Sequence, residues 1–93
     1  MAGKQSAAQR RVTLITREGC HLCNAAEATV RQLQPELGYA LDIRDVDADP
    51  ALKAEFSDRV PVVLIDGAEH GYWRIEEARF RNALAGRRWG RRL

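Results

Sequence analysis

The stretch REGCHLC, residues 17–23, decides how the chain folds. Its two cysteines stand three residues apart, directly after Gly19, and the β-branched run VTLIT (12–16) precedes them. Such a run is typical of a buried strand, and glycine favours the turn that follows it. Beyond the turn, apolar residues recur every three or four positions, at Leu22, Ala26, Val30, Leu33 and Leu37. This spacing predicts an amphipathic helix with Cys20 at or near its N-cap, which Pro35 and Gly38 bring to an end.

The rest of the chain predicts five more elements. Alternating apolar and polar residues from Tyr39 to Val46 or Asp47 indicate a strand exposed on one face. Asp49 before Pro50 is typical of a helix start and predicts a short helix over 50–56. Two strands, 61–65 and 69–73, flank the turn residues Asp66-Gly67, and a helix follows over 75–85. The order β-α-β-α-β-β-α predicts an α/β fold with a mixed four-stranded sheet flanked by helices.

Composition and charge indicate a small soluble domain. The chain has 93 residues, 45% of them hydrophobic, which is enough for one modest core. No apolar run approaches the roughly 20 residues of a membrane span, and the first residues lack the apolar stretch of a secretory signal. We therefore expect a monomeric, cytoplasmic protein that binds no membrane.

The charges are unevenly distributed. From residue 12 to residue 78 there are 6 basic and 13 acidic residues, a net charge of −7, whereas both ends are basic. We divide the chain into a flexible N-terminal extension (1–11), a folded domain (12–86) and a basic tail (87–93). The tail RRWGRRL interleaves arginine with tryptophan, a pattern that binds nucleic acid in other contexts. Because the tail is short and the domain is acidic, we favour a solvated end over a nucleic-acid site.

The helical position of the cysteine pair suits thiol chemistry. Residues three apart at a helix start lie on one face, close enough for a disulfide to form after a small adjustment. Cys20, at the helix end, is expected to be exposed beside backbone N–H groups that favour its thiolate, so it is the predicted nucleophile. Cys23, one turn further in, is the predicted resolving cysteine. Arg17 and His21 are the cations available to support the thiolate.

Several separated features together resemble the glutaredoxin-like branch of the thioredoxin superfamily. They are VTLITREGCHLC, the pair Val60-Pro61 before a strand, the Asp-Gly hairpin and the last helix. The resemblance implies a thioredoxin-like fold and a cis proline at Pro61 that packs against the cysteine motif. It also implies that the backbone of Val60 hydrogen-bonds a thiol substrate, and that Arg17 faces a substrate carboxylate.

The chain also departs from the pattern of glutathione-using glutaredoxins. His21-Leu22 replaces Pro-Tyr between the cysteines, and Arg59 replaces a threonine before Val-Pro. Residues 71–74, Gly-Tyr-Trp-Arg, stand where that family has two glycines and an acidic residue. We therefore include His21 and Leu22 among the predicted substrate-binding residues. The electron donor stays open between glutathione, another low-molecular-weight thiol and a reductase.

Other interpretations of these residues were weighed. A zinc site needs four ligands, and beyond the cysteines only His21 and His70 remain, so we expect no metal and no cofactor besides a redox-active disulfide. An iron–sulfur cluster shared between two copies is a lesser alternative. His70 is expected to be a surface histidine and Arg59 a loop arginine. Tyr72 and Trp73 either pack against the sheet or form a substrate platform.

Two functions from different classes follow. The favoured one is a thiol–disulfide oxidoreductase in which Cys20 forms a mixed disulfide with a protein or small-molecule substrate and Cys23 resolves it. A reducing thiol or reductase then restores the dithiol. The alternative is a binding module or redox switch on the same fold, with metal or nucleic acid as possible ligands and no reductase activity.

Overall fold

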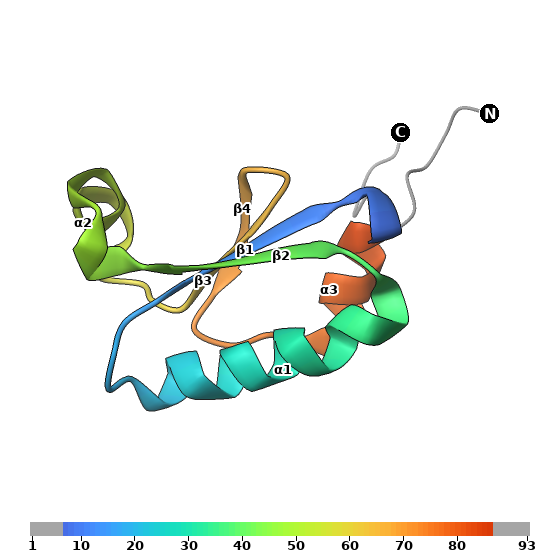
Figure 1. Cartoon of the computed structure of the whole chain (residues 1–93), viewed down its shortest axis with the longest axis horizontal. Coiled ribbons are helices and arrows are strands. Elements are labelled where there is room, and N and C mark those ends of the chain that lie inside the picture. Colours follow the sequence, from blue (N-terminus) through green and yellow to red (C-terminus); the bar gives the residue numbers. More distant parts are fainter. Residues whose placement is uncertain (1–6, 87–93) are drawn as a thin grey trace.

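The computed structural model describes residues 7–86, so the predicted basic tail and residues 1–6 lie outside the described part of the chain. Two 3-10 turns, three helices and four strands follow one another in the order that the sequence predicts for its main elements (Figure 1). Their bounds are η1 Ala7–Gln9, β1 Arg11–Thr16, α1 His21–Leu37, β2 Ala40–Asp45, η2 Val46–Ala48, α2 Pro50–Phe56, β3 Val62–Ile65, β4 Ala68–Tyr72 and α3 Glu77–Leu84.

The four strands form the predicted mixed sheet, in the order β2-β1-β3-β4. The crossover through α1 makes β1 and β2 parallel, whereas β3 runs antiparallel to both β1 and β4. Asp66 and Gly67 both have positive φ, 52° and 85°, and they connect β3 to β4 as a two-residue hairpin turn. A bulge between Val63 and Leu64 interrupts the register of that hairpin.

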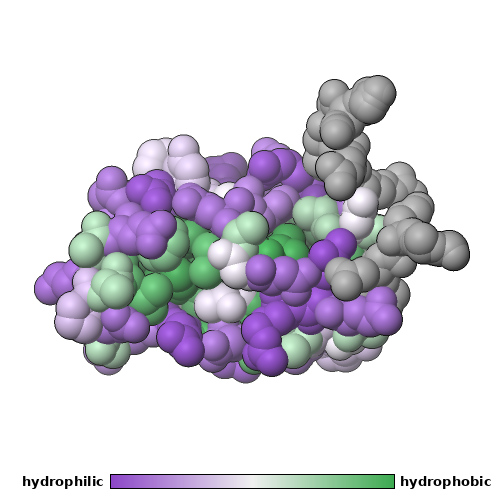
Figure 2. Space-filling model, turned by 90° about the horizontal axis from the view of Figure 1, so that it is seen from above, coloured by the Kyte–Doolittle hydropathy of each residue, from purple (hydrophilic) through white to green (hydrophobic). Residues whose placement is uncertain are grey.

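Alternation along the strands divides the core between the two faces of the sheet. On one face, Val12, Leu14, Val63 and Ile65 pack with buried residues of α1 and α3, which both lie beneath the sheet in Figure 1. On the other face lies a smaller cluster, to which α2 contributes Phe56. Its members are Ile15, Val46, Phe56 and Val62. Figure 2 looks down on this second face and shows apolar surface along its middle, bordered by hydrophilic side chains. The short α2 therefore leaves much of this face without a covering helix.

The elements differ from prediction mainly at their ends. Pro35 lies inside α1 instead of ending it, and the helix ends three residues later, where Gly38 takes a φ of 85°. The last helix begins at Glu77, two residues later than predicted, since Glu76 is its extended N-cap residue. Within the segment that we assigned to the N-terminal extension, Ala7–Gln9 form η1 and Arg11 begins β1. The domain boundaries as such stay a prediction.

The helix stripe needs one correction. Leu22 is 47% exposed, and the buried residues of α1 are Cys23, Ala26, Val30 and Leu33. Cys23 thus takes the core position that the sequence pattern assigned to Leu22. Within residues 7–86, no helix combines the length and the apolar character that crossing a membrane requires.

Candidate active site

The two cysteines lie at the N-terminus of α1, where the chain leaves β1. Cys20 is the N-cap residue, with extended backbone, and its sulfur accepts a hydrogen bond from the backbone N–H of Cys23 at 3.1 Å. The sulfur occupies the place that a serine or aspartate oxygen takes in most helix caps. Both side chains are free thiols. The predicted N-cap position of Cys20 is confirmed, and the cap bond brings the two residues into direct contact.

The two thiols differ sharply in their environment. Cys20 is partly exposed, whereas Cys23 is only 1% exposed and belongs to the buried stripe of α1. Burial, followed by the hydrogen bond with Cys20, raises the pKa of Cys23 to about 11. The backbone of Arg17 acts in the opposite direction on the same thiol, through a hydrogen bond that favours the thiolate. At neutral pH, Cys23 is therefore a protonated thiol held behind an accessible one.

Arg17 is engaged with residues far along the chain. Its Nε and Nη2 donate to the two carboxylate oxygens of Asp47, at 2.9 and 3.0 Å, and Nη2 also donates to Ser57 Oγ at 2.7 Å. The hydrogen bonds from Arg17 lower the pKa of Asp47. This network ties the segment before the cysteines to η2 and to the end of α2. The predicted contact of Arg17 with a substrate carboxylate stays a prediction, and the sequence offered no signal for its two partners.

The peptide bond between Val60 and Pro61 is cis, as the resemblance implied. Pro61 is buried and its carbonyl accepts the N–H of Trp73 at 2.7 Å, which attaches the segment after β4 to the start of β3. Val60 is half-buried, and no residue in 7–86 hydrogen-bonds its backbone. That is compatible with the predicted role of Val60 in binding substrate backbone, which no contact in the structure tests.

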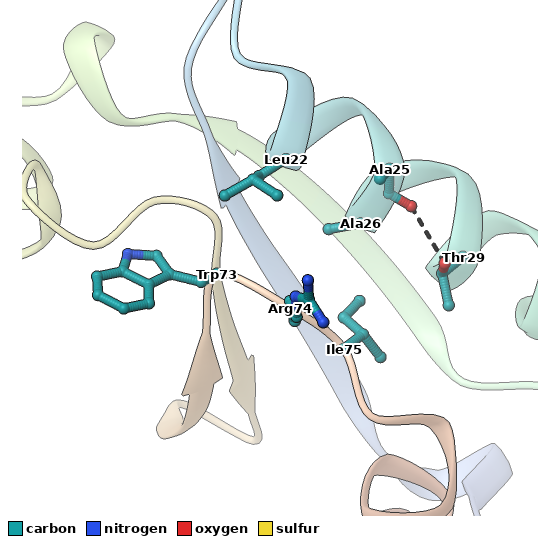
Figure 3. Close-up of a pocket in the computed structure, with 7 residues that line it drawn as sticks. All are labelled: Leu22, Ala25, Ala26, Thr29, Trp73, Arg74 and Ile75. Atoms are coloured by element: carbon teal, nitrogen blue, oxygen red, sulfur yellow. Dashed lines mark hydrogen bonds between the residues drawn. The ribbon is translucent and has the colours of Figure 1, made fainter.

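A surface hollow of about 300 Å³ opens between α1 and the segment after β4 (Figure 3). We call it the first hollow. Figure 3 shows Leu22 at one end, on the first turn of α1, with Arg74 between Trp73 and Ile75 on the opposite wall. Its lining residues are Leu22, Ala25, Ala26, Thr29, Trp73, Arg74 and Ile75. Leu22 is thus the predicted substrate-binding residue that lines a cavity, whereas His21 is exposed on the same turn.

The aromatic pair that we weighed as core or platform is on the surface. Tyr72 is 45% exposed and Trp73 52%, and the two rings meet edge to face with 5.0 Å between their centroids. His70, by contrast, is half-buried against Phe80, and burial, followed by the charge of Arg79, lowers its pKa. Arg59 forms an ion pair with Glu69. Among residues 7–86, no three His, Cys, Asp or Glu side chains gather in a way that could hold a metal ion.

Solved structures resemble this fold along most of the chain. Protein Ne2328 from Nitrosomonas europaea has a TM-score of 0.68 and 26% identity, covering 86% of this chain and 93% of its own. Protein XcR50 from X. campestris has a TM-score of 0.61 and 28% identity, covering 81% and 96%. Thioredoxin from Fasciola hepatica has a TM-score of 0.60 at 19% identity, covering 87% and 83%. The predicted thioredoxin-like fold is confirmed.

Sequence comparison places the chain in a family. Uncharacterized proteins of Mycobacterium tuberculosis (Rv0508) and Mycobacterium bovis (Mb0520) are 44% identical to it over 79 residues, which cover 80% of this chain and 81% of theirs. A family model described as Glutaredoxin-like domain (DUF836) matches residues 11–85, nearly all of the described structure. The chain therefore belongs to the glutaredoxin-like domain family.

Proposed function

We propose that the protein is a thiol–disulfide oxidoreductase that acts through Cys20 and Cys23. The observation that carries this proposal is the asymmetry of the pair: one partly exposed sulfur at a helix N-cap, hydrogen-bonded to the N–H of a cysteine that is 1% exposed. Backbone N–H groups at a helix N-terminus stabilise a negatively charged sulfur, so Cys20 is the nucleophile. The family to which the chain belongs is described as glutaredoxin-like, and this supports the same class of reaction.

The reaction runs in two exchanges. The Cys20 thiolate attacks one sulfur of a substrate disulfide, the substrate S–S bond breaks, and the other substrate sulfur leaves as a thiolate that takes up a proton. Cys23 then loses its proton and attacks Cys20 Sγ, which releases the second substrate sulfur as a thiol. The substrate gains two electrons, and the protein ends with a Cys20–Cys23 disulfide. Two electrons from a donor thiol or a reductase restore the dithiol.

The surroundings suggest how the reacting groups are held. Arg17, fixed by Asp47 and Ser57, steadies the turn before Cys20. We propose that Val60 offers its unpaired backbone groups to the substrate, beside buried Pro61. Leu22 and His21 contact the substrate from the first helical turn. The donor is glutathione, another low-molecular-weight thiol or a reductase in a reducing cytoplasm, and the disulfide substrate is a protein or a small molecule.

The experiment compares single-cysteine variants of the full chain. We expect Cys23→Ser to accumulate a mixed disulfide on Cys20 when a disulfide substrate is added, detected as a mass increase that a reductant reverses. Cys20→Ser should be inactive and should trap nothing, because buried Cys23 has no access to substrate. Equal trapping by the two variants, or no disulfide reduction by the unmodified protein with any member of a donor panel, contradicts the proposal and favours a binding module.

A further inference from the structure

Arg74 lines the hollow that Leu22, the residue before Cys23, also lines. Most arginines of the described chain are neutralised or held: Arg17 by Asp47, Arg59 by Glu69 and Arg81 by Glu36. Arg74 is different, because no side chain within residues 7–86 forms a hydrogen bond or an ion pair with its guanidinium. It is exposed, and it lines the first hollow in the company of apolar side chains.

Arg74 also belongs to a second hollow of about 300 Å³, on its other side. This second hollow is lined by His70, Gly71, Tyr72, Arg74, Glu76 and Arg79. Two arginines and one glutamate line this hollow, and the lowered pKa of His70 favours its neutral imidazole, so the net charge of the lining residues is positive. The two hollows therefore form one surface that is apolar next to Leu22 and cationic beyond Arg74.

Trp73, which lines the first hollow next to Arg74, has a backbone conformation that large residues rarely adopt. Its φ is +70°, in the left-handed region, and the hydrogen bond from its N–H to the Pro61 carbonyl holds it there. The ring is half exposed and meets the Tyr72 ring edge to face, so core packing does not explain the strained backbone. Strain kept without a packing gain is typical of a residue held for contact with another molecule.

From these observations we infer that the surface shared by the two hollows selects a disulfide-bearing protein segment in which an apolar side chain and an acidic one flank the reactive cysteine. The apolar side chain enters the first hollow between Leu22 and Trp73. The carboxylate pairs with Arg74, whose guanidinium contacts no carboxylate of residues 7–86. The apolar hollow and the cationic hollow share Arg74, so one segment that carries both an apolar and an acidic side chain fits them together, and this favours a peptide as the occupant. The inference rests on the proposed function and adds its substrate class.

The test uses three symmetrical peptide disulfides, each with a leucine before the cysteine and two glutamates, two glutamines or two lysines after it. Reduced full-length protein reacts with each in a single turnover, and the released peptide thiol is measured after an acid quench. We expect the acidic peptide to react about tenfold faster than the basic one, the size of two modest surface charge interactions. High salt should diminish the ratio.

Variants locate the effect. Arg74→Glu should reverse the order of the acidic and basic peptides, and Arg74→Gln should abolish the difference. The matched control is Arg44→Glu, which makes the same charge change on β2 at an exposed arginine paired with Asp42, away from both hollows. We expect this control to keep the order seen with the unmodified protein.

Trp73→Gly tests the apolar part without threatening the fold, because glycine adopts a positive φ freely. We expect the variant to keep or gain thermal stability. It should react several-fold more slowly with the acidic leucine peptide, but not with a peptide in which glycine replaces that leucine. Equal rates for all three peptides, or a preference that Arg74→Glu leaves unchanged, overturn the inference. The inference is also overturned if substitutions of Arg74 change only the rate of reaction with oxidised glutathione, a small disulfide that carries carboxylates. Failure to reduce any disulfide instead contradicts the proposed function itself.

Discussion

The step in which Cys23 resolves the mixed disulfide is expected to accelerate steeply with pH well above neutrality. Burial is the largest cause of the raised pKa of Cys23, about 11 against an ordinary 9.0, and the hydrogen bond with Cys20 comes second. When Cys20 is joined to substrate, it no longer offers that thiol partner, but Cys23 remains buried. We therefore expect the pKa of Cys23 to stay above 9.0 in the mixed disulfide.

The expected magnitude follows from the thiolate fraction. At pH 7, a thiol with a pKa of about 11 is ionised in about one molecule in 10,000, whereas a pKa of 9.0 gives about one in 100. The more basic thiolate is also the better nucleophile, which recovers about tenfold of that loss. Because part of the shift to about 11 comes from the Cys20 thiol, which is absent in the mixed disulfide, burial slows resolution at pH 7 by at most about tenfold. The rate should then rise about tenfold with each pH unit until the pKa of Cys23 is approached.

A coloured aromatic disulfide reagent separates the two steps. Attack by Cys20 releases the first coloured thiolate, and attack by Cys23 on the mixed disulfide releases the second, so stopped-flow absorbance records two phases. Cys23→Ser is the control, because it should release one equivalent and show no second phase. A second phase that levels off below pH 9 would refute the reasoning, since it would mean that burial does not suppress the thiolate of Cys23.

Three further predictions concern the scaffold. Asp66→Asn keeps the hairpin turn but removes the carboxylate that binds Arg10. Because the contact with Arg10 lowers the pKa of Asp66, the ion pair stabilises the fold above the ordinary pKa of 3.8, and this stabilisation is lost as the pH falls. Urea titration at pH 7 should show a loss of about 1 kcal/mol, and a loss that persists unchanged at pH 2 would contradict this. Phe80→Ala removes a fully buried ring that packs against Tyr39 and should lower the free energy of unfolding by about 3–5 kcal/mol. A loss under about 1 kcal/mol in the same titration would mean that α3 does not pack against the core through Phe80. Gly19→Ala imposes a side chain at φ 79° and should destabilise the fold by about 1 kcal/mol, with a slower first phase in the two-step assay. An unchanged first phase would mean that the conformation of this turn does not affect the reactivity of Cys20.

Local patterns were enough to predict the elements and the position of the cysteine pair. The strand before Gly19, the helix after it and the Asp66-Gly67 turn each depend on residues close together in sequence, and each is observed. The ends were harder, because competing local signals act there. Pro35 lies in the last turn of α1 without ending the helix, and the stop comes three residues later at Gly38, whose positive φ suits a C-cap.

The surroundings of the cysteines could not be predicted in the same way, because they arise from contacts between distant segments. Arg17 meets Asp47 and Ser57 only after β2 and α2 have folded back beside it, thirty and forty residues along the chain. The first hollow likewise depends on how α1 and the segment at Trp73 approach each other. A sequence pattern indicates which residues are apolar or charged, but not which of them keep a free guanidinium.

The register of α1 links the stability of the fold to the chemistry of the pair. Cys23 shares one buried stripe with Ala26, Val30 and Leu33, so it is both a core residue and the proposed resolving cysteine. Its N–H donates a hydrogen bond to Cys20 Sγ, the atom that attacks the substrate in the proposed reaction. Once that sulfur enters a neutral disulfide, it accepts a hydrogen bond more weakly than a thiolate does. In the proposed reaction, the first exchange therefore weakens the hydrogen bond that caps α1 before Cys23 acts as the second nucleophile.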